Sequence, residues 1–87
     1  MFAVYFQEYK SILYSDTLVP DIFISEYLPS MPCEQVKVYL YCLFLSKYNK
    51  KATTEDLSKK LGMDYDTVSN AIAALVNLGI MERKDNA

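Results

Sequence analysis

The segment from Cys33 to Asn49 carries hydrophobic residues on two sides of a predicted helix. At 100° per residue, one stripe consists of Val36, Tyr39, Leu40 and Leu43, and a second, nearly opposite stripe consists of Val38, Cys42 and Leu45. A helix with two apolar faces normally lies between two layers. We expect the rest of the domain to cover one face. Either the N-terminal segment or another subunit would cover the other, and coverage by the chain itself is the simpler alternative.

Two prolines bound a shorter helical pattern before this segment. Pro20 suits the first position of a helix, and Pro29 predicts its end at Leu28, because proline lacks an amide hydrogen and disfavours helical geometry in the preceding residue. Phe23 and Tyr27 lie four residues apart and share one side of this helix.

The first fourteen residues have a β-like composition. Their aromatic and aliphatic residues are Phe2, Val4, Tyr5, Phe6, Tyr9, Ile12, Leu13 and Tyr14. Polar residues interrupt this series, so we predict one or two short strands, followed by a turn or helix cap at residues 15–17.

Residues 53–79 carry the start and stop signals of two consecutive helices. Thr53 is the predicted N-cap of the first, with Asp56 at the third helical position as a weaker form of the capping box, and Gly62 ends it. Asp64 is the predicted N-cap of the second helix, and Gly79 its end. Two helices joined by about three residues that include a glycine predict a helix-turn-helix.

The second of these helices has one apolar and one polar face. The inward stripe is Val68, Ala71, Ile72, Leu75 and Leu78, and Met63 is placed to pack onto Val68 as a hydrophobic staple. The opposite face carries Asp66, Ser69, Asn70, Ala73 and Asn77. This outward face is small, polar and flat, and its only charge is negative.

Residues Ile80 to Glu82 are expected to form a strand after the second helix. In winged-helix proteins such a strand pairs with another to form the wing, but this sequence ends before a partner strand. Either the chain is a fragment without its wing, or the strand pairs with the N-terminal segment. We therefore predict a mainly α, winged helix-turn-helix-like single domain with a small β component. It would span residues 1–87, with an N-terminal strand extension at 1–17, a helical core at 18–83 and the helix-turn-helix at 53–79, and form the N-terminal part of a longer protein.

The charge of the two-helix motif is unfavourable for binding a phosphate backbone. Residues 53–79 contain two cations, Lys59 and Lys60, against four acidic residues, Glu55, Asp56, Asp64 and Asp66. Phosphate contacts usually supply much of the affinity for DNA. Further cations flank the motif at Lys47, Lys50, Lys51, Arg83 and Lys84, in an arrangement more typical of solvated loops.

Composition excludes several classes of function. Nine basic and eleven acidic residues give a net charge of −2, whereas duplex binders are usually strongly basic. There is no histidine, which excludes Cys-His zinc sites and histidine-based catalysis, and Cys33 and Cys42 would lie about 13 Å apart along one helix, too far for a disulfide. With glycine only at positions 62 and 79, no phosphate-binding loop is present. We expect no enzymatic activity and no cofactor.

No signal peptide is recognisable at the N-terminus, and the longest apolar run, residues 38–45, is less than half of a membrane span. We expect a reduced, cytoplasmic protein that does not enter a membrane.

Three motifs follow one another along residues 18–83. They are VPDIFISEYLP at 19–29, VKVYLYCLFL at 36–45, and a helix-turn-helix that ends in LVNLGIMER at 75–83. Together they resemble the N-terminal domain of DnaD-type bacterial replication initiation proteins, of a clostridial or phage-like type. The helix-turn-helix part is generic, but an FI-x-EYLP helix before a KVYLY helix is fairly specific.

This resemblance implies a winged-helix domain of the primosome that serves mainly self-association and partner contacts. In such proteins a separate helical C-terminal domain carries the DNA-binding signature, and that part is absent from this sequence. The minimal wing departs from the family pattern, so no function of the wing is carried over.

Two functions follow as alternatives. The first is a non-enzymatic self-association and protein-interaction module of a replication initiation protein, whose partners are further copies of itself, as a dimer or higher oligomer, and other primosome proteins. The residues expected at these contacts are Phe2, Val4, Phe6, Tyr9, Ile12, Leu13, Tyr14, Ile80 and Met81. The N-terminal aromatic residues would otherwise cover the domain's own core.

The second function is a sequence-specific DNA-binding winged-helix regulator. Its contacts with DNA would come from Lys59, Lys60, Ser69, Asn70, Asn77, Arg83 and Lys84. In the first alternative, this domain binds DNA only weakly or leaves DNA to a separate domain.

Overall fold

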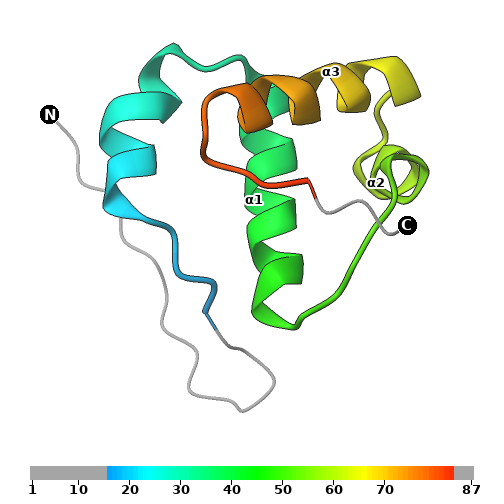
Figure 1. Cartoon of the computed structure of the whole chain (residues 1–87), viewed down its shortest axis with the longest axis horizontal. Coiled ribbons are helices and arrows are strands. Elements are labelled where there is room, and N and C mark those ends of the chain that lie inside the picture. Colours follow the sequence, from blue (N-terminus) through cyan, green and yellow to red (C-terminus); the bar gives the residue numbers. More distant parts are fainter. Residues whose placement is uncertain (1–15, 84–87) are drawn as a thin grey trace, which may run out of the picture.

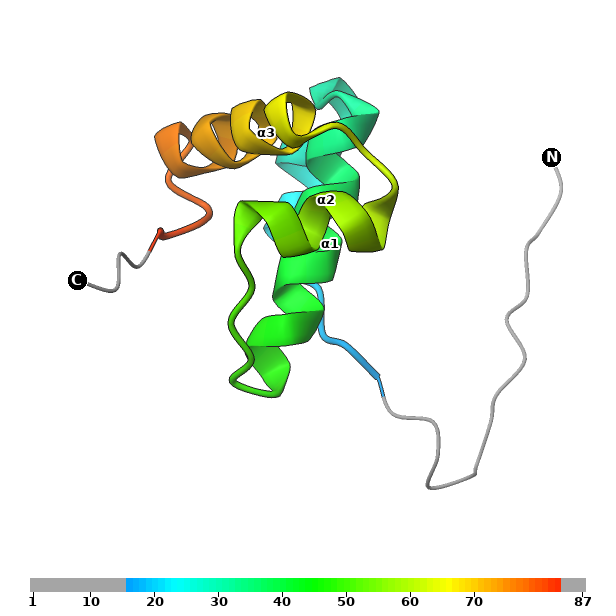
Figure 2. The same cartoon turned by 90° about the vertical axis from the view of Figure 1, so that its right-hand side faces the viewer.

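The computed structural model describes residues 16–83, which form a mainly helical fold (Figure 1). A short helical segment precedes three α-helices: α1 (Cys33–Lys47), α2 (Thr54–Leu61) and α3 (Tyr65–Asn77). Helix α1 is central, with the N-terminal helical segment on one side and α2 on the other, while α3 lies across its upper part. Figure 1 views α2 nearly end-on and α3 from the side, and Figure 2 shows α2 from the side, below α3.

One hydrophobic core joins these elements. Its buried residues are Phe23, Val38, Tyr39, Leu57, Val68, Ala71, Ile72 and Leu75. Within residues 16–83 no buried residue is polar or charged, so apolar burial is the main contribution to stability. Complete burial of one large apolar side chain contributes roughly 1.5–3 kcal/mol.

Each predicted stripe of α1 contributes one buried residue to the core, while residues 1–15, one of the two predicted covers of the second face, lie outside the described residues. Tyr39 of the first stripe and Val38 of the second are both buried. The Tyr39 ring stacks on Phe23 of the N-terminal helical segment, with ring centroids 4.0 Å apart and an interplanar angle of 14°. Leu40 differs from the prediction, because 39% of it is exposed although it was assigned to the first stripe.

The N-terminal helical segment, residues 21–30, changes geometry along its length. Its first two residues, 21 and 22, are α-helical. They are followed by a π-helical turn, η1 (Phe23–Tyr27), and then by a 3₁₀ turn, η2 (Leu28–Ser30). The Leu28 amide donates to the Phe23 carbonyl, five residues earlier. The predicted stop at Leu28 is therefore wrong by two residues. Pro29 lies in the first turn of η2, where its missing amide hydrogen is not needed.

The three α-helices end in the same way. Each is followed by a residue with positive φ, namely Asn49 (53°), Gly62 (65°) and Gly79 (79°). The next amide in each case donates to a carbonyl five residues earlier, in the pairs Lys50 to Leu45, Met63 to Ser58 and Ile80 to Leu75. This is the Schellman arrangement, and it confirms the predicted helix ends.

The two predicted N-caps differ in the structure. Thr53 and Asp56 form a complete capping box, in which each side chain accepts the other residue's backbone amide hydrogen at 3.1 Å. Asp64 occupies the N-cap position of α3, but its side chain makes no capping hydrogen bond. That part of the prediction is wrong, because this exposed carboxylate remains in solvent. Met63 is half-buried and packs against the cluster that contains Val68, consistent with the predicted staple.

The predicted strand at Ile80–Glu82 is not formed, and residues 16–83 contain no strand. Ile80 and Met81 instead follow the turn at Gly79 as irregular chain and pack half-buried against the core. The strands predicted for residues 1–14 lie outside the described residues. Leu78, predicted to face inward, is 47% exposed, because it lies at the C-cap of α3, beyond the last buried turn.

Among the described residues, no helix combines the length and the apolar character needed to cross a membrane.

Candidate interaction surfaces

An exposed apolar surface runs along the C-terminal half of α1. Leu40, Phe44 and Tyr48 follow one another at intervals of four residues and are 39%, 40% and 47% exposed. The Phe44 ring contacts Tyr41 at 5.8 Å and Tyr48 at 5.3 Å between centroids. We call Leu40, Tyr41, Phe44 and Tyr48 the aromatic strip. Single exposed hydrophobic residues are ordinary, but contiguous ones indicate a contact surface.

Two lysines connect the edges of the aromatic strip to neighbouring segments. Lys47 donates a hydrogen bond to the carbonyl oxygen of Asp16, and its ammonium group lies 5.2 Å from the centroid of the Tyr48 ring. Lys37 donates to the carbonyl oxygen of Leu61 at 2.8 Å. This carbonyl lies at the C-terminus of α2, where the helix dipole favours a cation. The strip is therefore bordered by residue 16 on one side and α2 on the other.

A hollow of about 280 Å³ lies beside the strip. Its lining residues are Asp16, Thr17, Leu18, Leu43, Ser46 and Lys47. Leu18 is 87% exposed, the highest value for a large hydrophobic residue among those described. The volume is below that of most small-molecule sites, which favours a side chain of a partner over a metabolite as the occupant.

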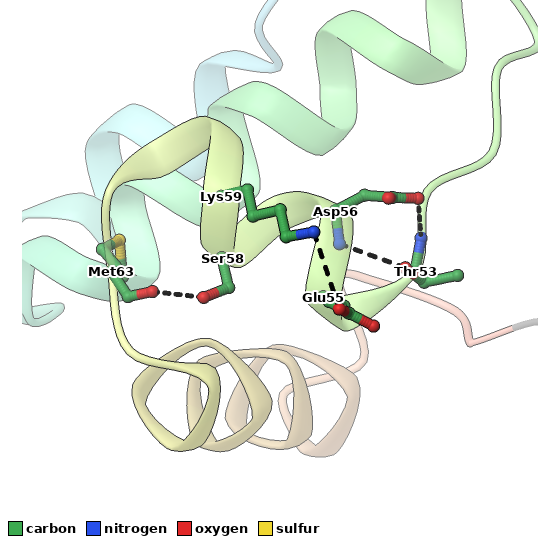
Figure 3. A network of polar contacts seen from close by, with 6 residues as sticks. All are labelled: Thr53, Glu55, Asp56, Ser58, Lys59 and Met63. Atoms are coloured by element: carbon green, nitrogen blue, oxygen red, sulfur yellow. Dashed lines mark hydrogen bonds and ion pairs between the residues drawn. The ribbon is translucent and has the colours of Figure 1, made fainter.

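Local polar contacts stabilise helix α2 and the turn that follows it (Figure 3). The Ser58 hydroxyl donates to the Met63 carbonyl, and Lys59 pairs with Glu55 at 3.7 Å on the exposed side of α2. Hydrogen bonds from the backbone and then the side chain of Thr53 lower the pKa of Asp56 from 3.8. Because exposed ion pairs are weak, the pairing of Lys59 adds little stability.

The outward face of α3 follows the sequence pattern. Asp66, Asn70, Ala73 and Asn77 are exposed, and Ser69 is half-buried. No basic residue lies between Tyr65 and Asn77, so this helix presents no cation to a phosphate.

The structure separates the candidate cationic DNA contacts from one another, although Arg83 lies beside Asn77. Lys59 and Lys60 lie in the last turn of α2, before α3 begins. Arg83 lines a hollow of about 200 Å³ with Ala73, Val76 and Asn77, near the other end of α3. A helix of this length extends about 20 Å, so these cations lie toward opposite ends of it. Lys84 lies outside the described residues.

The candidate self-association residues Phe2, Val4, Phe6, Tyr9, Ile12, Leu13 and Tyr14 also lie outside the described residues. Ile80 and Met81 are half-buried against the core. The aromatic strip was not among the surfaces predicted from the sequence. One feature of the sequence could have indicated this surface: Tyr41, Phe44 and Tyr48 are large and aromatic but belong to neither apolar stripe of α1.

The two cysteines are free thiols in different surroundings. Cys33 is exposed, whereas Cys42 is half-buried, and burial raises the pKa of the Cys42 thiol from 9.0. Burial also raises the pKa of Tyr39 from 10.0. Across residues 16–83, no group of three or more cysteine, aspartate or glutamate side chains could hold a metal ion.

Comparison with known proteins identifies no relative: no family model matches the chain, and neither a curated protein nor a solved structure does. A functional proposal therefore depends on the chain's own surfaces and on the sequence resemblance described above.

Proposed function

We propose that this chain is a non-enzymatic self-association and protein-interaction domain of a bacterial replication initiation protein, with a winged-helix-like fold. The observation that carries the protein-interaction part is the aromatic strip, in which the exposed Phe44 and Tyr48 rings contact each other and Phe44 also contacts the half-buried Tyr41. Tyrosine and phenylalanine are enriched at the centres of protein interfaces. The primosome assignment comes from the sequence resemblance alone.

The charge distribution supports a protein partner over DNA. The outward face of α3 has no cation, and the N-terminal ends of α2 and α3 carry the exposed acidic residues Glu55, Asp56, Asp64 and Asp66. Such a surface repels a phosphate backbone.

Self-association is assigned to the N-terminal segment. Sedimentation velocity over a wide range of protein concentrations tests it, with the full chain compared to a chain that lacks residues 1–14. We expect the full chain to form dimers or larger oligomers that dissociate on dilution, and the shortened chain to remain monomeric. A full chain that stays monomeric at the highest concentration, and is unchanged by the deletion, refutes self-association.

A DNA-binding regulator is the second candidate. Two observations favour it: α2 and α3 are consecutive and joined by three residues, which is compatible with a helix-turn-helix, and Arg83 lies beside Asn77. This function requires a duplex affinity that falls steeply with salt and weakens in Lys59→Ala and Lys60→Ala. Fluorescence anisotropy with labelled duplex tests it, and the absence of any change at low salt excludes it.

A further inference from the structure

We infer that the aromatic strip and the hollow beside Leu18 together dock an acidic amphipathic segment of a partner protein. This inference depends on the proposed protein-interaction function and adds the chemistry of the partner.

The strip has the geometry of a preformed contact surface. Leu40, Phe44 and Tyr48 project from one side of α1 at intervals of four residues, and the rings at 44 and 48 already meet edge to face. Because these side chains lie on a helix that is anchored in the core through Val38 and Tyr39, little conformational freedom is lost when a partner binds.

The hollow extends this surface on the Lys47 side of α1. Its lining combines the aliphatic side chains of Leu18 and Leu43 with the polar or charged residues Asp16, Thr17, Ser46 and Lys47. An apolar side chain of the partner would bury Leu18, which is 87% exposed. Apolar side chains that become buried at an interface usually contribute a large share of its binding energy.

The charges around the strip are mostly positive, unlike those of the rest of the domain. Four of the seven basic residues between positions 16 and 83 lie on α1 or within four residues of its end, namely Lys37, Lys47, Lys50 and Lys51. Two acidic residues lie at this surface, namely Glu34 in the first turn of α1 and Asp16 in the lining of the hollow. The hydrogen-bond partner of Lys37 is the neutral backbone carbonyl of Leu61 and not a carboxylate. A segment with acidic residues beside its apolar ones complements this pattern.

The same charges disfavour a second copy of the chain on the strip. A two-fold axis at Phe44 would place Leu40 of one copy against Tyr48 of the other, which is an acceptable apolar match. It would also bring together the lysines of both copies, and like charges across an interface are unfavourable.

A single-stranded nucleic acid is also negatively charged, and its bases stack on aromatic rings. The aliphatic parts of the surface, Leu40, Leu18 and Leu43, offer no ring to a base. They fit the apolar side chains of a protein segment better.

Fluorescence anisotropy with the full 87-residue chain and a labelled synthetic peptide tests the inference. The peptide is an amphipathic helix with leucine and phenylalanine four residues apart and glutamate beside them. A matched peptide carries lysine in place of glutamate. We expect the acidic peptide to bind, its affinity to fall with added salt, and the lysine peptide to show no binding.

Two pairs of variants locate the binding site. Phe44→Ala should weaken binding of the acidic peptide about tenfold or more, as expected for an aromatic anchor, whereas Ile24→Ala, which removes a 50% exposed residue elsewhere, should leave it unchanged. Lys50→Glu should weaken binding several-fold, and Lys60→Glu, on α2, should not. Circular dichroism should show unchanged folding, since all four side chains are exposed.

Several results would overturn the inference: no binding of the acidic peptide, equal binding of the lysine peptide, or equal losses in Phe44→Ala and Ile24→Ala. Binding of a labelled oligothymidine that Phe44→Ala abolishes, in place of peptide binding, would assign the strip to nucleic acid. Self-association abolished by Phe44→Ala would assign it to a second copy. Failure of peptide binding with self-association through residues 1–14 intact refutes only this inference, whereas failure of both also refutes the proposed function.

Discussion

Replacing Phe23 with leucine tests whether the N-terminal helical segment belongs to the folded core. Phe23 is the only fully buried residue of that segment, 1% exposed, and its ring stacks on Tyr39 of α1 at 4.0 Å. If this contact holds residues 21–30 against α1, weakening it must lower the stability of the whole domain.

The expected magnitude follows from burial and from the ring contact. At about 0.05–0.15 kcal/mol per residue, a chain of 87 residues has a free energy of unfolding of roughly 4–13 kcal/mol. Phe23→Ala would remove about 3–5 kcal/mol, enough to unfold a marginal domain. Leucine retains most of the apolar volume and loses the stacking, worth about 0.5–1.5 kcal/mol, while leaving a small cavity. We expect Phe23→Leu to destabilise the domain by about 1–2 kcal/mol.

Urea denaturation followed by circular dichroism measures this change, and thermal denaturation should show a midpoint lowered by about 5–15 °C. Ile24→Ala is the control, because this neighbour is 50% exposed and should change stability by less than about 0.5 kcal/mol. A double-mutant cycle with Tyr39→Leu should yield a coupling energy of about 0.5–1.5 kcal/mol. If Phe23→Leu were as mild as Ile24→Ala, the N-terminal helical segment would not share the cooperative core.

Three further changes test local features. Thr53→Ala removes the acceptor for the Asp56 amide and should cost about 1 kcal/mol in urea denaturation. The lowered pKa of Asp56 contributes stability above its ordinary value of 3.8 that is lost on acidification; NMR titration should show this pKa rising in Thr53→Ala. Gly79→Ala should cost about 1 kcal/mol from positive φ alone, because nothing lies within 4 Å of the added Cβ; a much larger loss would reveal a clash. A thiol reagent should modify Cys33 rapidly and Cys42 slowly, with Cys33→Ser leaving only the slow phase. The raised pKa of Cys42 also means that stability should fall as pH rises above 9.0.

Features determined by neighbouring residues were predictable from the sequence. Each of the helix ends at Asn49, Gly62 and Gly79 requires one residue in the left-handed backbone conformation. Asparagine and glycine adopt this conformation most easily. The capping box at Thr53 is likewise complete within four residues. The inward stripe of α3 was predicted apart from Leu78, because a single apolar face leaves one way for a helix to pack.

Features that depend on distant partners were not predictable in this way. Helix α1 is apolar nearly all round, so its periodicity could not show that Leu40 and Phe44 lie on the uncovered side. Ile80 to Glu82 has a strand-like composition, but a strand requires a partner, and none lies beside it in the described part of the chain. The π turn at Phe23 and the 3₁₀ turn at Pro29 also depend on how the segment packs against α1.

The small contribution of α2 to the core has a consequence for native-state fluctuations. Of the eight buried residues between positions 16 and 83, six belong to α1 and α3, whereas α2 supplies only Leu57. Helix α2 is eight residues long, too short to persist alone, and should open without the rest of the domain unfolding. Its amides should therefore exchange with solvent deuterium sooner than those of α1 and α3. Lys37 joins α2 to the edge of the aromatic strip through its hydrogen bond to Leu61. Binding of a partner to the strip should therefore slow the exchange of the α2 amides relative to the free protein.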